Sequence, residues 1–415
     1  MKGIHIFAQI LAKIDWDVFN RIVSKHNGDK AVKSHGCRDI FTLLMFSQVS
    51  GADSLREISQ GLSTQGNGLN HIYMDKVPKP STLSYALAHR PWEVYRDMFE
   101  SLVQVVKPKL SKKRGLNGMK TRLFSVDSTT IDLCLSMYPW AKFHHAKGAV
   151  KIHTVLDHAG LIPVFAHITE GRTHDVKAFK EGVMPDFDFP KGSIVAMDRG
   201  YVDYGLFNTM TTKGVFFVTR LKDNAVFEEV ELRSKSNFTE DGAVRRDVHI
   251  KLTSAKGSLC PHTLRSVTIW IAEKKKEMVI LTNILHLAAS TIAAIYKQRW
   301  QVELFFKQIK QNLNIKSFLG TSENAVKAQI YSALCTVLLM QDLKNISDSM
   351  RAKIHKATFS FSNMVTMLRI NLFHYHSLDE WLVNPFIAPR MGTPVQSQTI
   401  DLFGQHENGG RGSFW

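Results

Sequence analysis

The stretch that decides the fold is residues 291–313, TIAAIYKQRWQVELFFKQIKQNL, which lies in a long helix predicted over residues 290–312. Four polar side chains occupy offsets 0, 3, 7 and 14 along it: Tyr296, Arg299, Glu303 and Lys310. At about 100° per residue, all four fall within one narrow stripe of the helix surface. One face of this helix is therefore expected to carry a phenol, a guanidinium, a carboxylate and an ammonium group.

This polar face has two interpretations. On a solvated surface, Arg299 would pair with Glu303 one turn away and do nothing more. In a catalytic site, the same side chains would face a substrate, while Leu304 and Phe305 lie outside the stripe and are expected to pack into the core. The helix alone favours the solvated surface, so the decision depends on other acidic residues in the chain.

Two further carboxylates follow short apolar strands. Residues 123–126 (LFSV) are predicted to form a strand that ends at Asp127, and residues 193–197 (SIVAM) form one that ends at Asp198. Neighbouring strands that end at one edge of a sheet place such side chains a few ångströms apart. A helix docked on that sheet brings Glu303 beside them.

Three acidic side chains without a cationic partner in the core repel one another unless a cation is bound. Hard carboxylate oxygens select Mg²⁺, with Mn²⁺ as its substitute. Two such ions can activate a water or a 3′-hydroxyl and stabilise the leaving oxygen of a phosphodiester. Arg299 and Lys310 beside that site would hold DNA phosphates.

These residues resemble those of the DDE transposases of the bacterial insertion sequence four family. The helix matches the family's Tyr-x2-Arg-x3-Glu-x6-Lys signature at all four fixed positions: Tyr296, Arg299, Glu303 and Lys310. Asp127 in SVDSTTID is similar to the family's first aspartate, and Asp198 in AMDRGYVD to its second. The resemblance covers roughly residues 120–345, and the N-terminal block resembles the helical domain that precedes the catalytic domain in one branch of the family.

The resemblance implies an α/β, RNase H-like catalytic domain with a β-rich insertion between the second Asp and the Glu. The gap of 303 − 198 = 105 residues leaves room for such an insertion. It also implies cut-and-paste transposition, often through a hairpin at the transposon end, binding of double-stranded DNA at terminal inverted repeats and at the target, and action as a homodimer. In relatives, an insertion-domain tryptophan stacks on a flipped base, and Trp270 is the candidate here. The alternative for Trp270 is a buried strand aromatic.

The composition agrees with a nucleic-acid partner. Lys and Arg number 53 against 37 Asp and Glu, which gives a net charge of +16 and suits a polyanion. The widely spaced cysteines form no CxxC pair, so a reducing, intracellular compartment is expected. The resemblance implies that the protein acts on DNA in a bacterial cytoplasm. Neither a signal peptide nor an apolar stretch long enough to span a membrane is predicted.

The pattern along the chain predicts seven segments. These are a helical N-terminal DNA-binding domain (1–106), a basic linker (107–122), the first part of the RNase H-like core (123–222), the β-rich insertion (223–285), the second part of the core (286–345), a C-terminal helical region (346–384) and a disordered tail (385–415). Short helices near residues 55–58 and 80–84 suggest either a helix-turn-helix-like DNA reader or an ordinary helical bundle.

Two other functions compete with transposition. A different RNase H-like endonuclease would share the three acids but not the Tyr-Arg-Glu-Lys stripe. A non-catalytic DNA-binding protein derived from a transposase would have lost a carboxylate, and none is lost. His144-His145 and His174-Asp175 receive no catalytic role, since isolated histidines in a basic protein more often contact phosphate or the core.

Overall fold

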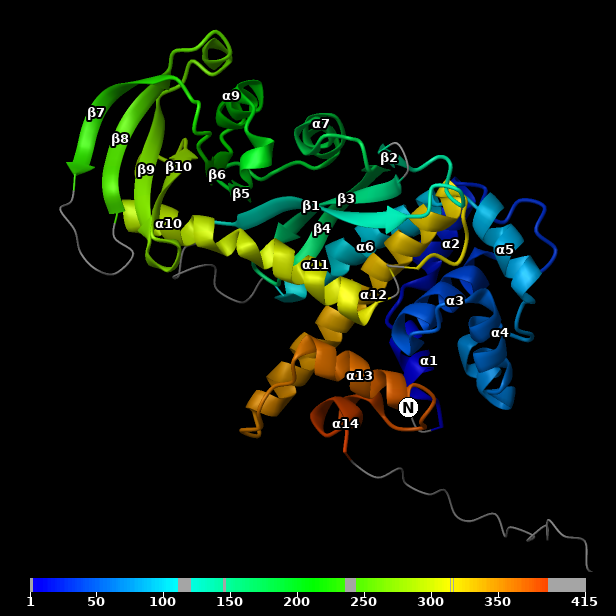
Figure 1. Cartoon of the computed structure of the whole chain (residues 1–415). Coiled ribbons are helices and arrows are strands. Elements are labelled where there is room, and N and C mark those ends of the chain that lie inside the picture. Colours follow the sequence, from blue (N-terminus) through cyan, green and yellow to red (C-terminus); the bar gives the residue numbers. More distant parts are fainter. Residues whose placement is uncertain are drawn as a thin grey trace, which may run out of the picture.

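The computed structural model describes residues 3–110, 121–144, 147–235, 244–313, 315 and 317–386. Figure 1 shows a large sheet with α7 and α9 on one side and α10 and α11 on the other, while the N-terminal helices lie beside the C-terminal ones. The N-terminal block is helical, as its periodicity predicts. Its elements are α1 (Ile6–Leu11), α2 (Trp16–Lys25), α3 (Cys37–Ser50), α4 (Leu55–Ser63), the 3-10 helix η1 (Gly66–Ile72), α5 (Pro80–His89) and α6 (Glu93–Leu110).

The connection between α4 and α5 decides between the two interpretations of this block. A helix-turn-helix joins its helices by a turn of about 3–4 residues. Here residues 64–79 lie between α4 and α5 and include η1. The helix-turn-helix interpretation is therefore wrong for this pair, and the block is a helical bundle.

One mixed sheet runs through the rest of the molecule. Its order is β2-β3-β1-β5-β6-β10-β9-β8-β7, with β4 paired to β3. β3 is antiparallel to both β1 and β4, whereas β5 and β6 run parallel to β1. The strands are β1 (Leu123–Leu133), β2 (Lys142–His144), β3 (Lys147–Asp157), β4 (Ile162–Glu170), β5 (Ile194–Met197), β6 (Phe216–Arg220), β7 (Phe227–Lys235), β8 (Val244–Leu252), β9 (Leu264–Ile271) and β10 (Lys276–Thr282).

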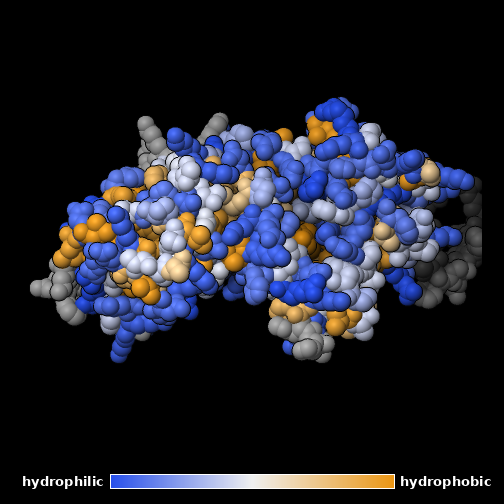
Figure 2. Space-filling model, turned by 90° about the horizontal axis from the view of Figure 1, so that it is seen from above, coloured by the Kyte–Doolittle hydropathy of each residue, from blue (hydrophilic) through white to orange (hydrophobic). Residues whose placement is uncertain are grey.

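The β-rich block predicted over 223–285 extends this sheet. β10 pairs with β6, and β9, β8 and β7 follow in antiparallel order. Its last strand is therefore shared with the core. Figure 2 shows hydrophobic residues at this end of the molecule among mostly hydrophilic ones. Val230 and Leu232 of the edge strand β7 are among the exposed apolar side chains.

Two predicted element boundaries are wrong. β1 does not end at Asp127: its pairing with β5 stops at Val126, but its antiparallel pairing with β3 continues to Leu133. The basic linker does not begin at Lys107, because residues 107–110 form the last turn of α6, and residues 111–120 lie outside the described part.

The single helix predicted over 290–312 is two helices, α10 (Ala289–Gln298) and α11 (Trp300–Asn312). They separate at Arg299, where two backbone hydrogen bonds span three residues instead of four: Arg299 to Tyr296 and Val302 to Arg299. No Gly or Pro marks this break in the sequence. Leu304 is 42% exposed, so its predicted core position is also wrong, whereas Phe305 is buried.

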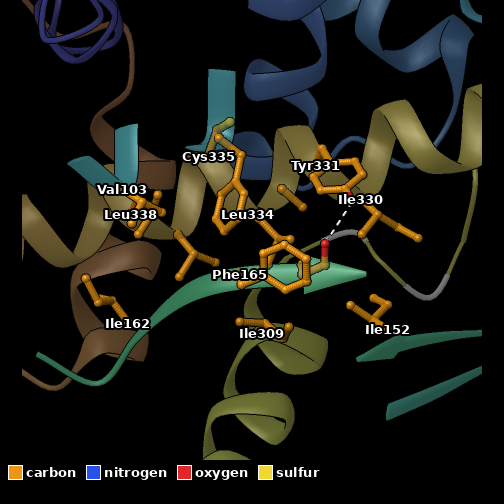
Figure 3. Packing of buried hydrophobic residues seen from close by; sticks show 14 of the residues in the cluster. Val103, Ile152, Ile162, Phe165, Ile309, Ile330, Tyr331, Leu334, Cys335 and Leu338 are labelled. Carbon is orange, nitrogen blue, oxygen red and sulfur yellow. Dashed lines mark hydrogen bonds between the residues drawn. The ribbon is translucent and has the colours of Figure 1, made fainter. Parts of the chain in front are cut away.

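The helix α12 (Glu323–Ala352) joins the sheet to the N-terminal bundle. It packs against α3, α6 and β4. Figure 3 shows Tyr331, Leu334 and Leu338 of α12 lying over Phe165 of β4, and the Tyr331 hydroxyl donates a hydrogen bond of 2.9 Å to the Ala166 carbonyl. A continuous apolar core thus extends from α1 across the sheet to the C-terminal helices.

The remaining helices either connect strands of the sheet or follow α12. α7 (Asp175–Ala178), the π-helical turn η3 (Phe179–Val183) and α8 (Met184–Asp186) follow one another, and α9 (Tyr204–Thr212) follows the 3-10 turn η4 (Arg199–Tyr201). α13 (Phe361–Asn371) and α14 (Leu378–Val383) pack beside α12. Of the predicted tail, residues 387–415 lie outside the described part. No helix in the described ranges is long and apolar enough to cross a membrane.

A buried ion pair fixes the loop that leads into α10. Arg265 of β9 is 1% exposed and donates two hydrogen bonds of 2.7 Å to the Asp247 carboxylate of β8. Its third nitrogen donates to the Leu287 carbonyl at 2.6 Å. The segment before the polar-faced helix is thereby tied to the insertion strands.

We expect Asp247→Ala to lower the free energy of unfolding by about 3–5 kcal/mol, because it leaves the Arg265 charge buried without a partner. The matched control is Glu229→Ala, which breaks the exposed Arg246–Glu229 pair between β8 and its other neighbour, β7, and should cost about 1 kcal/mol or less. Denaturant unfolding of both variants measures the difference. Equal losses would contradict the role given to the buried pair.

Candidate active site

The two aspartates become neighbours through the pairing of β1 with β5. Val126 and Met197 are register partners in this parallel pair, so the next residues of the two strands, Asp127 and Asp198, lie side by side. Asp127 is held in the sheet, and its carboxylate accepts a 2.8 Å hydrogen bond from the Ser128 N–H. Asp198 directly follows β5, as predicted, and is exposed where it caps η4. The predicted proximity therefore rests on the register of the parallel pair.

Glu303 reaches β1 from α11 through Arg299. The Arg299 guanidinium is 2.6 Å from Glu303 Oε1 and 3.6 Å from Asp127 Oδ2. Its side chain is 14% exposed. Asp127 and Glu303 therefore do have a cationic partner within the protein, the Arg299 side chain. The i,i+4 pair of the solvated-face interpretation exists, but it lies against the sheet.

The pKa of Asp127 depends on its burial and on the charged groups around it. Burial raises the pKa of Asp127 to about 6, and the carboxylates of Asp198 and Glu303 act in the same direction, against the Ser128 N–H and Arg299. Within the described ranges, no three His, Cys, Asp or Glu side chains form a ready-made ligand set. The three acids share one electrostatic environment, and Arg299 lies between two of them.

Tyr296 and Lys310 lie on either side of this pair. The Arg299 guanidinium is 6.0 Å from the Tyr296 ring centroid, and burial raises the pKa of the Tyr296 hydroxyl, with a further effect of Asp198. Lys310 Nζ donates a 2.9 Å hydrogen bond to the Thr130 carbonyl of β1. The structure thus brings Arg299 and Lys310 of the predicted stripe to the strand that carries Asp127, with Glu303 joined to Asp127 through Arg299 and Tyr296 beside Arg299.

A cleft of about 430 Å³ lies between parts of β1 and α11. Its lining residues include Asp127, Ser128, Glu303, Lys307 and Lys310. Lys307 is exposed and was not predicted, although its position four residues after Glu303 is a visible signal. Two carboxylates and two ammonium groups therefore face one opening, which suits an anionic chain bound beside a cation.

Asp175 supports the segment that follows Asp127, a role not predicted from the sequence. It accepts a 2.7 Å hydrogen bond from the Ser128 hydroxyl and a 3.2 Å hydrogen bond from Lys151. His153 Nδ1 lies 3.8 Å from it, with a pKa lowered by burial to about 4. His174 beside it is exposed, while the side chain of His144 and all of His145 lie outside the described part.

Trp270 lies at the same edge of the sheet as the aspartates but away from them. Through β6 and β10, Ala196 of β5 is level with Arg265 of β9, and these two strands run in the same direction. Trp270 is therefore three strands away and about 10 Å farther along than Asp198. The Arg245 guanidinium stacks on its ring, 4.8 Å from the centroid.

The comparison with known families decides what this arrangement is. The family described as Transposase DDE domain matches residues 118–339, more than half of the chain. The chain belongs to the DDE transposase family. A second family, described as a domain of unknown function (DUF4372), matches residues 2–74 of the transposase. DDE transposase domains generally use divalent metal ions.

Several known proteins resemble the transposase. The putative transposase y4zB of Sinorhizobium fredii is 32% identical over 64% of this chain and 71% of the relative. The probable transposase for insertion sequence element IS5377 of Geobacillus stearothermophilus is 30% identical over 60% of this chain and 64% of the relative. A solved piggyBac transposase synaptic complex with hairpin DNA has 10% identity and a TM-score of 0.46, covering 93% of this chain and 84% of the other.

We expect Arg299→Ala to slow processing of transposon ends at least tenfold while metal binding persists, because a charge-assisted hydrogen bond contributes about 1.5–3 kcal/mol. Arg299→Lys keeps a charge but not the planar fork, so it should recover only part of the rate. Nicking, second-strand cleavage and strand transfer on a paired-end substrate measure these steps. Normal rates for Arg299→Ala at all three steps would reduce the Arg299–Glu303 pair to a surface feature.

Proposed function

We propose that the transposase belongs to the insertion sequence four family and moves its element by cut and paste. In this proposal it binds terminal inverted repeats, cleaves the transposon ends and joins them to target DNA. Two observations carry the proposal: the register of β1 with β5 puts Asp127 beside Asp198, and the Arg299 guanidinium lies between Asp127 and Glu303 of α11. The insertion-sequence transposases among its relatives support the same activity.

The proposed core is RNase H-like. Supporting this are the three antiparallel strands β1, β3 and β4, followed by β5 and β6, which run parallel to β1 on its other side. The first acid lies on the central strand β1 and the second directly after β5. The insertion strands β7–β10 enter between the second acid and Glu303, as the resemblance implies.

Asp127, Asp198 and Glu303 are the proposed ligands of Mg²⁺ or Mn²⁺, with two ions in the complete site. The donor set fits, because carboxylate oxygens are the ligands these ions prefer. The pKa of Asp127 is raised chiefly by burial and further by the Asp198 and Glu303 carboxylates, so a bound cation would stabilise its charged form. The ions would lower the pKa of the attacking hydroxyl and neutralise charge on the phosphodiester.

The chain's own residues would position the DNA. Lys307 and Lys310 face the cleft and would contact phosphates on either side of the scissile bond. Arg299 would hold Glu303 in place and neutralise charge near Asp127, and Tyr296 would pack beside it. Trp270, with Arg245 stacked on its ring, would contact a base of the transposon end away from the cleavage point.

The wider assembly is part of the same proposal. A homodimer would hold two ends together, and the N-terminal bundle of residues 1–106 would bind DNA. The net charge of +16 supports an extended contact with a polyanion. The transposase would act on DNA in the bacterial cytoplasm. A different endonuclease explains the acids equally well, but not the family match over residues 118–339.

We expect Asp127→Ala, Asp198→Ala and Glu303→Ala each to abolish strand cleavage with Mg²⁺ while leaving binding of the ends largely intact. Each variant removes oxygen ligands from the proposed site without changing the N-terminal bundle. Asp132→Ala is the matched control, since this exposed carboxylate lies on β1 beyond the cleft. Cleavage and end binding are measured on DNA that carries the element's own ends.

The outcome for each residue is separate. Full cleavage by any one of the three variants would remove that residue from the catalytic set. Loss of cleavage in Asp132→Ala as well would point to a general disturbance of β1. A wild-type chain that binds its ends but never cuts them would favour the non-catalytic alternative.

A further inference from the structure

The N-terminal bundle holds one arginine in an unusual way. The Arg38 guanidinium carbon lies 4.4 Å from the centroid of the Trp16 ring and 4.7 Å from that of the Tyr73 ring. Aromatic rings near a guanidinium attract it and limit the motion of its plane. No carboxylate of the described residues lies within salt-bridge distance of Arg38, and its Nε is buried without a hydrogen-bond partner. The guanidinium is thus held between two rings without a salt bridge, although its charge also acts on the neighbouring Asp39 carboxylate.

His71 shares the same cavity. Arg38, His71, Trp16 and Tyr73 line a cavity of about 270 Å³, and none of its lining residues is acidic. His71 Nδ1 is also buried without a partner. The His71 ring is fixed by the ring of His5, with centroids 5.3 Å apart. Two buried nitrogen atoms that can donate hydrogen bonds are therefore unsatisfied in residues that line this largely apolar cavity.

Buried polar atoms of this kind lower the stability of the fold unless a partner satisfies them. A buried donor without an acceptor costs about 1–3 kcal/mol, and native proteins leave few of them. Tyr73 adds a second cost, since its φ of 57° is left-handed for a residue other than glycine. Tyr73 is nevertheless 75% exposed while it lines the cavity. Strain of this kind persists where a ligand is held.

We propose that this cavity, the Arg38 pocket, binds a phosphate group of the DNA backbone. A guanidinium with a fixed plane and an imidazole nitrogen present donors, which match the acceptor oxygens of a phosphate. Free phosphate offers the same chemistry, and the experiment below separates the two sources. The pocket lies wholly within residues 2–74, so it gives the matching domain of unknown function a specific ligand class. The DNA source rests on the proposed function.

The test compares Arg38→Met with the wild-type full chain. Methionine keeps an unbranched side chain between the two rings but removes the charge and the donors. We expect binding of a duplex with the element's end to weaken about tenfold, with the slope of log K against log salt reduced by about 0.9, the value of one phosphate contact. Arg38→Lys should keep most of that slope and recover part of the affinity. Arg21→Met, an exposed arginine of α2, is the control.

The second arm uses inorganic phosphate. In one outcome, phosphate protects the wild type against thermal unfolding but not Arg38→Met, while the two bind DNA equally. That result would keep the Arg38 pocket as a phosphate site and exclude the DNA backbone as the source of the phosphate. Equal DNA affinity, salt slope and phosphate response in wild type and Arg38→Met would overturn the pocket. A lowered melting temperature with unchanged binding would likewise assign Arg38 to structure only. A wild-type chain that binds no DNA would instead contradict the proposed function.

Discussion

The guanidinium of Arg299 joins the two parts of the active site that the sequence keeps far apart. It contacts Glu303 on its own helix and Asp127 on β1, so a single cation fixes how α11 meets the sheet. Without it, Glu303 and Asp127 would face each other as like charges in a partly buried place. The break between α10 and α11 falls at this residue, which lets both helices follow the sheet while the guanidinium points at β1.

The placement of that contact depends on a continuous core. α12 packs against β4 on one side and against α3 and α6 on the other, so the N-terminal bundle and the sheet are parts of one packed body. The insertion is equally integrated, because β10 pairs with β6 and Arg265 ties β9 to the loop before α10. The cleft, the insertion strands and the Arg38 pocket are therefore parts of one packed body.

The features that could be predicted from the sequence are those that depend on local patterns of residues. The acids Asp127 and Asp198 follow apolar runs, and the Glu303 helix shows its polar stripe, so the candidate site could be assembled from spacing alone. The β-rich character of residues 223–285 was also predicted, and strands β7 to β10 lie there. Long-range pairing could not be predicted. No residue near Asp127 indicates that β1 continues to pair with β3 beyond it. No glycine or proline near Arg299 indicates the break between α10 and α11.

The pocket around Arg38 shows the same limit, since its two rings come from Trp16 and Tyr73, on either side of α3. Only the folded bundle brings them together. Asp175 is a similar case. Its role is to accept a hydrogen bond from Ser128, and these two residues lie too far apart in the sequence for the contact to be predicted.

The central claim is that the three carboxylates form one cation site around Arg299. Anomalous diffraction from crystals of the chain bound to a transposon end and soaked with Mn²⁺ tests it most directly. The account predicts Mn²⁺ peaks bounded by the carboxylates of Asp127, Asp198 and Glu303, with the guanidinium of Arg299 still on Glu303. Peaks that avoid these three side chains in a crystal that cleaves its DNA would contradict it.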